Sequence, residues 1–598
     1  MTGELSVIES ELKSHFGDDL DQSLLAECVK VCQLYNVSGE RFFYKHEALI
    51  LNQPPHPFSL KDIQEVKAMI KRDLDRENLT KRFAKGKLGG PQSRNFAKGG
   101  GLGGGLPGTP VKPVRRQDGF DLPRFQESKF SVAGPSRVNY VGPPMDESAR
   151  KKRTYRYMYE KVSERSEVLD DRIDHFGELV KAYYDVEELG DPSAVTEEEV
   201  TVVGRIVHDA ESSSGSVKLN EASLVLESSR MMGSGARVPL RFDADVKVRR
   251  GVRNGGGQGL FPGAIVALKG KNGGGGSFYV TEILSLPPLD PSSGVQVKSE
   301  TAETHFSMFI ACGPFTPEAD LAYRPLQNLV SKLKEAKPAV VLLTGPFIDA
   351  THPAIKVGDV DATPREMFQA ELVNRLREFL DASPGSTILL VPSTRDILSD
   401  HAVFPQCELP RALCNDARIR LLPNPARFTL NGVHVAASSV DVLFHLRKEE
   451  FFKRAAEVDP QSQSTASSPE GPDAMANLCR HILQQRSFYP IFPVPLDLAH
   501  DVNLDVTHSD MMYLCPQEDE SEEDGVDAQD DPARARCAPD VLVVPSRLKH
   551  FSKVVDNTVA VNPSFLTKAT YAVLEYAGHG APGPAKDRIK VEIHRLEA

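Results

Sequence analysis

The sequence predicts a multidomain protein with helical, β and α/β parts, and three changes of hydrophobic period along its 598 residues carry this prediction. Up to about residue 70, apolar side chains recur every three or four positions, as in helices. From 196 to 290 they alternate with a period of two, as in half-buried strands. Beyond 300, short apolar runs alternate with helical segments, which is typical of a layered α/β domain.

Residues 1–78 predict a small helical bundle, a unit suited to docking rather than to chemistry. In LDQSLLAECVKVCQLYNV one helix face collects Leu24, Leu25, Cys28, Val31, Cys32 and Tyr35. Ser38 is placed to cap the helix that follows, and Glu40 falls in its first turn, where the helix dipole favours an acid.

Residues 79–150 predict a flexible basic linker, because nine Lys or Arg and no acid stand between 81 and 117 among many glycines. Thr109, followed by Pro110, is a candidate phosphorylation site for a proline-directed kinase. Basic residues of a possible nuclear import signal are Lys112, Arg115, Arg116, Arg150, Lys151, Lys152 and Arg153. The alternative for both motifs is an ordinary solvated linker.

Connecting helices are predicted over 151–195, and a small closed barrel such as the OB-fold over 196–290. Five short strands separated by glycine-rich turns carry the barrel prediction: VTVVGRIVH (200–208), ASLVLESS (222–229), RVPLRFD (237–243), AIVALKGK (264–271) and SFYVTEIL (277–284).

The α/β domain is predicted over 300–598, with strands at 306–313, 339–345, 386–392, 433–439 and 541–546 and helices at 326–336 and 364–382. Two polar stretches interrupt it, 458–473 and the acidic 517–531, and both are expected to be disordered surface insertions.

Composition limits the function classes. A net charge of −12 disfavours indiscriminate binding to nucleic acid. Eight cysteines without a CxxC pair indicate neither a zinc site nor a disulfide framework, and we expect no cofactor. No apolar run reaches the roughly 18 residues of a membrane helix, and the amino terminus is acidic, so we expect a protein inside the cell without a membrane anchor.

In such a domain ligands gather beyond the carboxyl ends of the strands, here ACGPFT (311–316), TGPFID (344–349) and VPSTRD (391–396). Their order and sequence resemble the calcineurin-like metallophosphoesterases, whose active members carry D-x-H, GDxxD and GNHD or GNHE at these places. Each motif is degenerate here, at Cys312, Pro314, Pro346, Thr394 and Arg395.

Two metal ions need several anionic or imidazole ligands. Pro314 and Pro346 offer no side-chain ligand, and Arg395 adds a positive charge. We therefore expect an inactive domain without catalytic or metal-binding residues. The remaining acids, Asp349 and Asp396, are expected to pair with a nearby arginine or cap a helix. His434, His445, His481 and His550 are expected to be core or edge residues.

A barrel followed by an inactive phosphoesterase domain resembles the accessory B subunits of the replicative DNA polymerases. Local matches run in order over most of 195–570, among them GLFPGAIVALKGKNGGGGSFYVTEIL (259–284), LLVPSTRDILSDHAVFPQ (389–406) and PDVLVVPSRLKHF (539–551). The helical amino-terminal module on a modifiable tether is more similar to the polymerase alpha group than to the delta and epsilon groups.

The resemblance implies a non-catalytic nuclear subunit that holds the carboxy-terminal domain of the DNA polymerase alpha catalytic subunit. It further implies a complex with the small and large primase subunits, acting in primer synthesis at the initiation of DNA replication, with weak or indirect DNA contact and no membrane. The zinc-binding cysteines of that assembly would belong to the partner.

Three alternatives stay open: an accessory subunit of another replicative polymerase, an active phosphoesterase or nuclease, and an OB-fold protein that binds single-stranded nucleic acid. The last is suggested by Phe242, Phe261, Phe278, Tyr279 and the basic segment 241–253. Strand alternation would turn about half of these aromatic side chains inward, which favours a core and subunit-contact role.

Overall fold

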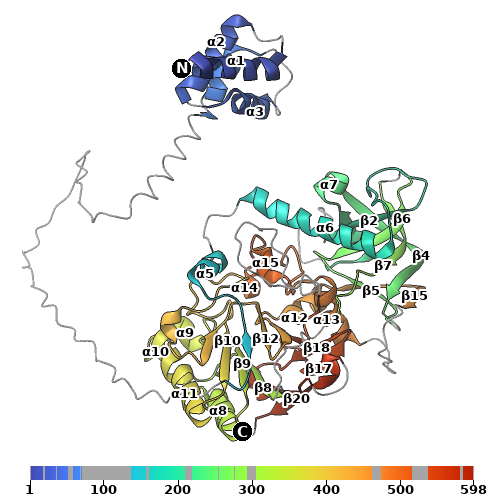
Figure 1. Ribbon diagram of the computed structural model, residues 1–598. Helices are drawn as coiled ribbons and strands as arrows, with labels where there is room; N and C mark the ends of the chain where they lie inside the picture. The colour runs from blue at the N-terminus through green and yellow to red at the C-terminus, as the bar shows by residue number, and fades with distance from the viewer. Residues whose placement is uncertain are drawn as a thin grey trace, which may run out of the picture. The chain divides into compact units, whose positions relative to one another are not determined.

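The structure is a computed structural model with two compact units, Met1–Pro123 and Arg124–Ala598 (Figure 1). It describes residues 2–17, 21–35, 37–50, 58–67, 69–70, 136–155, 161–208, 218–252, 255–274, 276–291, 305–460, 473–514, 537–579 and 584–596.

The first unit is a helical bundle with α1 (Thr2–Phe16), α2 (Gln22–Tyr35), α3 (Gly39–Ile50) and further helical residues over 60–67. Its core contains Leu12, Cys28, Cys32, Phe42 and Val66. The predicted cap is confirmed, because Ser38 Oγ accepts a hydrogen bond from Arg41 N at 3.3 Å. Thr109, Lys112, Arg115 and Arg116 lie outside the described residues.

The described part of the second unit begins with a segment over 136–155 that contains a strand and a helix, so the predicted linker extends too far at its carboxyl end. Strand β1 (Tyr140–Val141) pairs antiparallel with β12 (Ala426–Leu430). Val138 is buried in the core, and α5 (Glu147–Arg153) is capped by Asp146. A two-residue edge strand is held by main-chain hydrogen bonds, which the hydrophobic period does not reveal.

Helix α6 (Val162–Tyr184) leads into a closed barrel, as predicted. Its strands are β2 (Val200–His208), β3 (Leu224–Glu227), β4 (Arg237–Gly251), β6 (Ile265–Lys271) and β7 (Phe278–Leu284). Their order is β4-β3-β2-β6-β7, and a parallel pairing of β4 with β7 closes the ring. Short elements between them are η3 (Glu221–Ser223), α7 (Arg230–Gly233) and β5 (Gly257–Leu260).

The α/β part contains two six-stranded sheets. The first has the order β11-β10-β9-β8-β19-β20 and consists of β8 (Phe306–Cys312), β9 (Val340–Thr344), β10 (Thr387–Val391), β11 (Ile419–Leu421), β19 (Thr570–Tyr576) and β20 (Ile589–Arg595). The second has the order β1-β12-β13-β16-β18-β17, with β12 (Ala426–Leu430), β13 (Val433–Ala437), β16 (Val541–Val543), β17 (Phe551–Val555) and β18 (Thr558–Asn562). All five strands predicted for this domain are present, but the strand-rich second sheet was largely missed.

Helices cover the outer faces of both sheets, which gives four layers (Figure 1). The first sheet is covered by α8 (Arg324–Ala336) and by α10 (Pro364–Met367), a π-helical turn η4 (Phe368–Val373) and α11 (Asn374–Ala382). The second is covered by α12 (Val442–Glu449) and α13 (Ala474–Gln484). Shorter helices are α9 (Pro353–Val357), η5 (Arg411–Leu413), α14 (Ala499–Val502), α15 (Ser509–Met512), η7 (Leu566–Lys568) and α16 (Ala585–Arg588).

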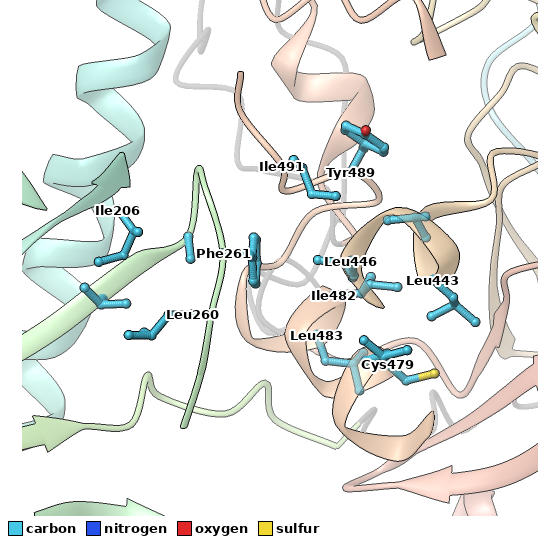
Figure 2. Close-up of a cluster of buried hydrophobic side chains, with 14 of the residues drawn as sticks. Ile206, Leu260, Phe261, Leu443, Leu446, Cys479, Ile482, Leu483, Tyr489 and Ile491 are labelled. Atoms are coloured by element: carbon cyan, nitrogen blue, oxygen red, sulfur yellow. The ribbon is translucent and has the colours of Figure 1, made fainter. Parts of the chain in front are cut away.

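The barrel and the α/β part share one hydrophobic core (Figure 2). Barrel residues Ile206 and Phe261 belong to the same buried cluster as Leu446 of α12 and Ile482 of α13. Beside this cluster, the side chain of Gln485 exchanges two hydrogen bonds of 2.8 and 3.0 Å with the main chain of the barrel strand β6. The two parts are therefore packed as one body.

Two short strands strengthen this joint. Strand β14 (Phe451–Arg454) pairs with β5, and β15 (Glu457–Pro460) pairs with β4. The predicted insertion 458–473 is consequently narrower than expected, since 458–460 form a strand and Asp473 caps α13. Residues 461–472 and the acidic 517–531 lie outside the described residues. Among the described helices, none is long and apolar enough to cross a membrane.

Candidate functional site at the carboxyl ends of the strands

The structure brings the predicted positions together at one edge of the first sheet. Strands β8, β9 and β10 are parallel neighbours, so the loops that follow them open at the same edge. Asp349 and Asp396 form an isolated β-bridge, and Ile397 N donates to Ile348 O at 3.1 Å. The three degenerate motifs therefore surround one place, as the sequence predicts.

Cys312 ends the first of these strands and is fully buried. Its thiol donates to the main-chain oxygens of Gly313 (3.3 Å) and Gly345 (3.6 Å). Burial raises the pKa of the Cys312 thiol to about 12, so the sulfur stays protonated at neutral pH. The neutral thiol is a buried core side chain at the end of this strand.

Asp349 pairs with Arg395, which confirms the expectation of a nearby arginine. Arg395 Nε lies 3.2 Å from Asp349 Oδ1, and its terminal nitrogen contacts the other carboxylate oxygen. Asp349 Oδ1 also accepts from the main chain (2.9 Å) and hydroxyl (2.7 Å) of Thr351. Four donor groups therefore already contact this carboxylate.

Among the described residues, Asp396 has neither an arginine partner nor a helix to cap, so that part of the prediction is wrong. Its carboxylate accepts three main-chain N–H groups, from Phe347, from Ile348 (3.0 Å) and from Ser393 (2.8 Å). Burial raises the pKa of Asp396 to about 7, against the three donors that lower it. The side chain ties two loops together.

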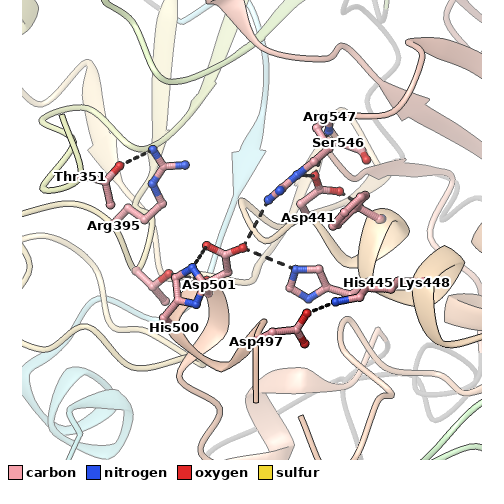
Figure 3. Close-up of polar contacts among 12 residues, drawn as sticks. Thr351, Arg395, Asp441, His445, Lys448, Asp497, His500, Asp501, Ser546 and Arg547 are labelled. Carbon is pink, nitrogen blue, oxygen red and sulfur yellow. Dashed lines mark hydrogen bonds and ion pairs between the residues drawn. The ribbon is translucent and has the colours of Figure 1, made fainter. Parts of the chain in front are cut away.

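A second set of residues at this edge was not anticipated (Figure 3). Thr394 Oγ1 donates to the main chain of Asp501 at 3.0 Å. Arg547, in the loop after β16, donates to Asp441 Oδ2 (3.0 Å) and to Asp501 Oδ2 (3.3 Å), and it lies over the ring of Phe444. Asp441 in turn caps α12 through Phe444 N at 3.2 Å.

His445 lies on the inner side of this set and is completely buried. Its Nδ1 is 3.0 Å from Tyr489 Oη, and its Nε2 is 3.9 Å from Asp501 Oδ2. His445 lowers the pKa of Asp501 to about 2, against the effect of burial and with help from His500 and Arg547. The histidine is a core residue, as expected.

Most of the acids at this site are paired with arginines of the same site. Arg395 contacts Asp349, and Arg547 contacts both Asp441 and Asp501. The fourth acid, Asp396, is held by main-chain N–H groups instead. Within the described ranges, no group of three or more His, Cys, Asp or Glu is placed to hold a metal ion. These contacts tie together loops that follow different strands.

Replacing Arg547 by methionine should lower the free energy of unfolding of the second unit by about 1–2 kcal/mol, because Asp441 and Asp501 lose their shared partner. Arg547→Lys, which keeps the charge but not the fork of donors, should lose less. Urea unfolding followed by circular dichroism measures both. Equal stability of the methionine variant and the wild type would contradict a role for this arginine in holding the loops.

His481 and two arginines of the predicted import motif occupy structural positions. His481 is buried, packs edge-on against Phe261 and lies 2.8 Å from Glu450. In the predicted import motif, Arg150 and Arg153 both contact the buried Glu408, at 2.6 and 3.3 Å. Burial alone would raise the pKa of Glu408, but the contacts with these two arginines hold this pKa below its ordinary value.

The four aromatic residues of the barrel do not form a common platform. Phe261 and Phe278 are buried in the core. Phe242 is partly buried, with Lys453 Nζ 5.1 Å from its ring centre. Tyr279 alone among the four is largely exposed, with 52% of its surface accessible. The expectation that alternation turns about half of them inward is confirmed.

Comparisons with known proteins agree with this architecture. A family model for the B subunit of DNA polymerases alpha and epsilon matches residues 308–553, and a model for the OB domain of the DNA polymerase alpha B subunit matches 166–286. Both models describe B subunits of DNA polymerases, and in this chain they match the α/β part and the barrel with its preceding helix α6.

Individual relatives narrow the assignment. The DNA polymerase alpha B subunit of Schizosaccharomyces pombe is 31% identical over 96% of this chain and 99% of its own length. The proteins of the same name from Saccharomyces cerevisiae and Rattus norvegicus are 32% and 28% identical over 70% and 69% of this chain, and the chain covers 59% and 60% of their lengths. The chain belongs to the family of DNA polymerase alpha B subunits. Likeness to solved structures is weak, with a TM-score of 0.20 and 11% identity to a crystal structure from Thermus thermophilus that covers 49% of this chain and 100% of its own.

Proposed function

We propose that this chain is the non-catalytic accessory subunit of DNA polymerase alpha–primase in the nucleus. In this role it holds the carboxy-terminal domain of the catalytic subunit so that primer synthesis can begin at the initiation of DNA replication. The observation that carries the proposal is the similarity to the polymerase alpha B subunit of Schizosaccharomyces pombe over nearly the full length of both chains. Both primase subunits would join the same complex through the catalytic subunit.

The edge of the first sheet supports a non-catalytic role. An inactive phosphoesterase-like domain explains why Pro314 and Pro346 stand at ligand positions. It also explains why Arg395 pairs with Asp349 and why Arg547 pairs with Asp441 and Asp501. Incubation of the purified chain with Mn²⁺ and bis(p-nitrophenyl) phosphate should release no nitrophenol above the rate of a heat-treated sample. Turnover that EDTA abolishes would overturn this part of the proposal.

The joint between the barrel and the α/β part supports a scaffolding role, because a surface that spans both parts has a fixed geometry. We assign docking to the amino-terminal helical unit, and regulation to Thr109, whose phosphorylation would add about two negative charges to a basic segment. Loss of cell-cycle-dependent modification in Thr109→Ala is the expected result. Nuclear import would rest on Lys112, Arg115 and Arg116 together with Lys151 and Lys152, since Arg150 and Arg153 are engaged by Glu408.

Affinity purification of the tagged chain from its own cells, followed by mass spectrometry, tests the assembly. One large polymerase alpha subunit and both primase subunits should be recovered in similar amounts. A chain that begins at residue 124 keeps the whole second unit and should recover the same three partners. Recovery of the delta or epsilon catalytic subunit instead would overturn the alpha assignment, and recovery without any polymerase subunit would overturn the scaffold.

A further inference from the structure

Three side chains form a row across neighbouring strands on the outer face of the barrel. In the strand registers Arg241 of β4 pairs with Tyr279 of β7, and Tyr279 pairs with Lys271 of β6. Directly paired residues project to the same face of a sheet, and neighbouring strands lie roughly 4.8 Å apart. The tyrosine therefore stands between two cations. We name these three residues the Tyr279 row.

The row is exposed, and its cations carry no partner. Arg241 and Lys271 are exposed, and within the described part of the chain neither side chain forms an ion pair or a hydrogen bond. Other cations of the same strands are paired: Lys269 lies 3.5 Å from Glu199, and Arg249 lies 2.6 Å from Glu282. The two free cations of the row remain available to an anion.

Buried neighbours on the same strands fix the position of the Tyr279 row. The residues beside Tyr279 on its strand, Phe278 and Val280, are completely buried, and so is Leu240, which pairs with Phe278. The strand therefore cannot turn to bury the tyrosine ring. An exposed ring on a fixed strand loses little conformational entropy when a ligand stacks on it.

We propose that the Tyr279 row binds single-stranded nucleic acid. One base would stack on the ring of Tyr279, and phosphates on either side would contact Arg241 and Lys271. In the turn after β6, a side chain added at Gly273 or Gly276 would meet nothing within 4 Å, so the described atoms do not crowd this turn. This contact goes beyond the assembly proposed above and does not depend on it.

Acidic residues near the Tyr279 row limit the affinity for nucleic acid. Asp243 and Asp245 follow Arg241 on β4 and are exposed, so they repel phosphates farther along this strand. Two phosphate contacts and one stacked base predict weak binding that tolerates sequence, with a dissociation constant of roughly 10⁻⁵ to 10⁻⁴ M at low salt. An acidic peptide would use the two cations but would gain less from a base-sized aromatic surface between them.

Fluorescence anisotropy of labelled (dT)12 with the full-length chain tests the proposal. Tyr279→Ala should weaken binding at least about fivefold, whereas Tyr279→Phe, which keeps the stacking surface, should bind like the wild type. The double variant Arg241→Gln, Lys271→Gln should lower the slope of log K against log salt concentration by about 1.4, as two lost phosphate contacts predict for a single strand.

Matched controls lie away from the row. Tyr44 is equally exposed, at 54%, in the first unit, and Lys356 is an exposed lysine on α9. Tyr44→Ala and Lys356→Gln should leave (dT)12 binding unchanged. The proposal is overturned if the full-length chain does not bind, if both tyrosine-to-alanine variants lose affinity equally, or if a polyglutamate peptide binds as tightly as (dT)12 irrespective of residue 279.

Discussion

Replacing Gly263 by alanine should lower the free energy of unfolding of the second unit by about 3–5 kcal/mol, near the upper end of single-substitution effects. Gly263 lies at the joint between the barrel and the α/β part, with φ at +92°. A side chain there would lie closer than van der Waals contact to Phe492 N and 2.7 Å from Pro490 O. Both obstacles are main-chain atoms, and Phe492 N is fixed by a 3.1 Å hydrogen bond to Pro262 O. The surrounding main chain therefore cannot move aside without breaking contacts.

Urea unfolding followed by intrinsic tyrosine fluorescence and circular dichroism measures this loss. Gly358→Ala is the matched control, because Gly358 also has a positive φ, +75°, but nothing lies within 4 Å of an added side chain. Its loss should be about 1 kcal/mol, the cost of a left-handed alanine alone. Similar losses in the two variants would show that the joint accommodates a side chain, which would contradict the close packing described above.

Replacing Asp396 by alanine should cost about 3–5 kcal/mol. The substitution leaves the N–H groups of Phe347, Ile348 and Ser393 buried without an acceptor, and each such group costs about 1–3 kcal/mol. Asp396→Asn keeps one carbonyl oxygen in place and should lose less. Urea unfolding at pH 5, where the carboxyl is protonated in the folded chain, compares the two variants with the wild type. An alanine variant as stable as the asparagine variant would contradict the three-donor arrangement.

The raised pKa of Asp396 also predicts a pH dependence. Between its ordinary value of 3.8 and its folded value of about 7, the folded chain holds a proton that the unfolded chain has lost. Stability contributed by this group therefore falls as pH rises from about 4 to 7 and is constant above that range. The wild type should lose more stability between pH 5 and pH 8 than Asp396→Asn does. If the free energy of unfolding changed with pH in the same way for both proteins, the raised pKa of Asp396 would be contradicted.

The barrel could be predicted because its strands are long enough to show alternation, as in Val200–His208. Strand β5 has the sequence GQGL, and β15 has EVDP, and neither shows an apolar period. Both are held by main-chain hydrogen bonds to partners distant in sequence, which side-chain patterns do not report. The same reason explains why the two-residue β1 was placed in the linker.

At the candidate site, the positions of the three loops could be predicted from the sequence motifs. The ion pairs between their side chains could be predicted only in part. The Asp349–Arg395 pair could be predicted because both residues stand in the degenerate motifs. The contacts of Arg547 could not be predicted, because this residue lies 106 positions from Asp441 and 46 from Asp501 in the sequence. Only the convergence of strands at one edge brings the three residues together. A sequence motif locates a loop, whereas long-range pairing depends on topology.

Strands β14 and β15 have a consequence for assembly. Because they join the barrel to the α/β part through main-chain ladders, the second unit needs no domain closure when a partner takes hold of both parts. The entropy of fixing their relative orientation has been lost during folding and is not lost a second time at association. A partner can therefore bind such a surface tightly with fewer strong contacts, and mutations in the two ladders should weaken association even though they touch no partner.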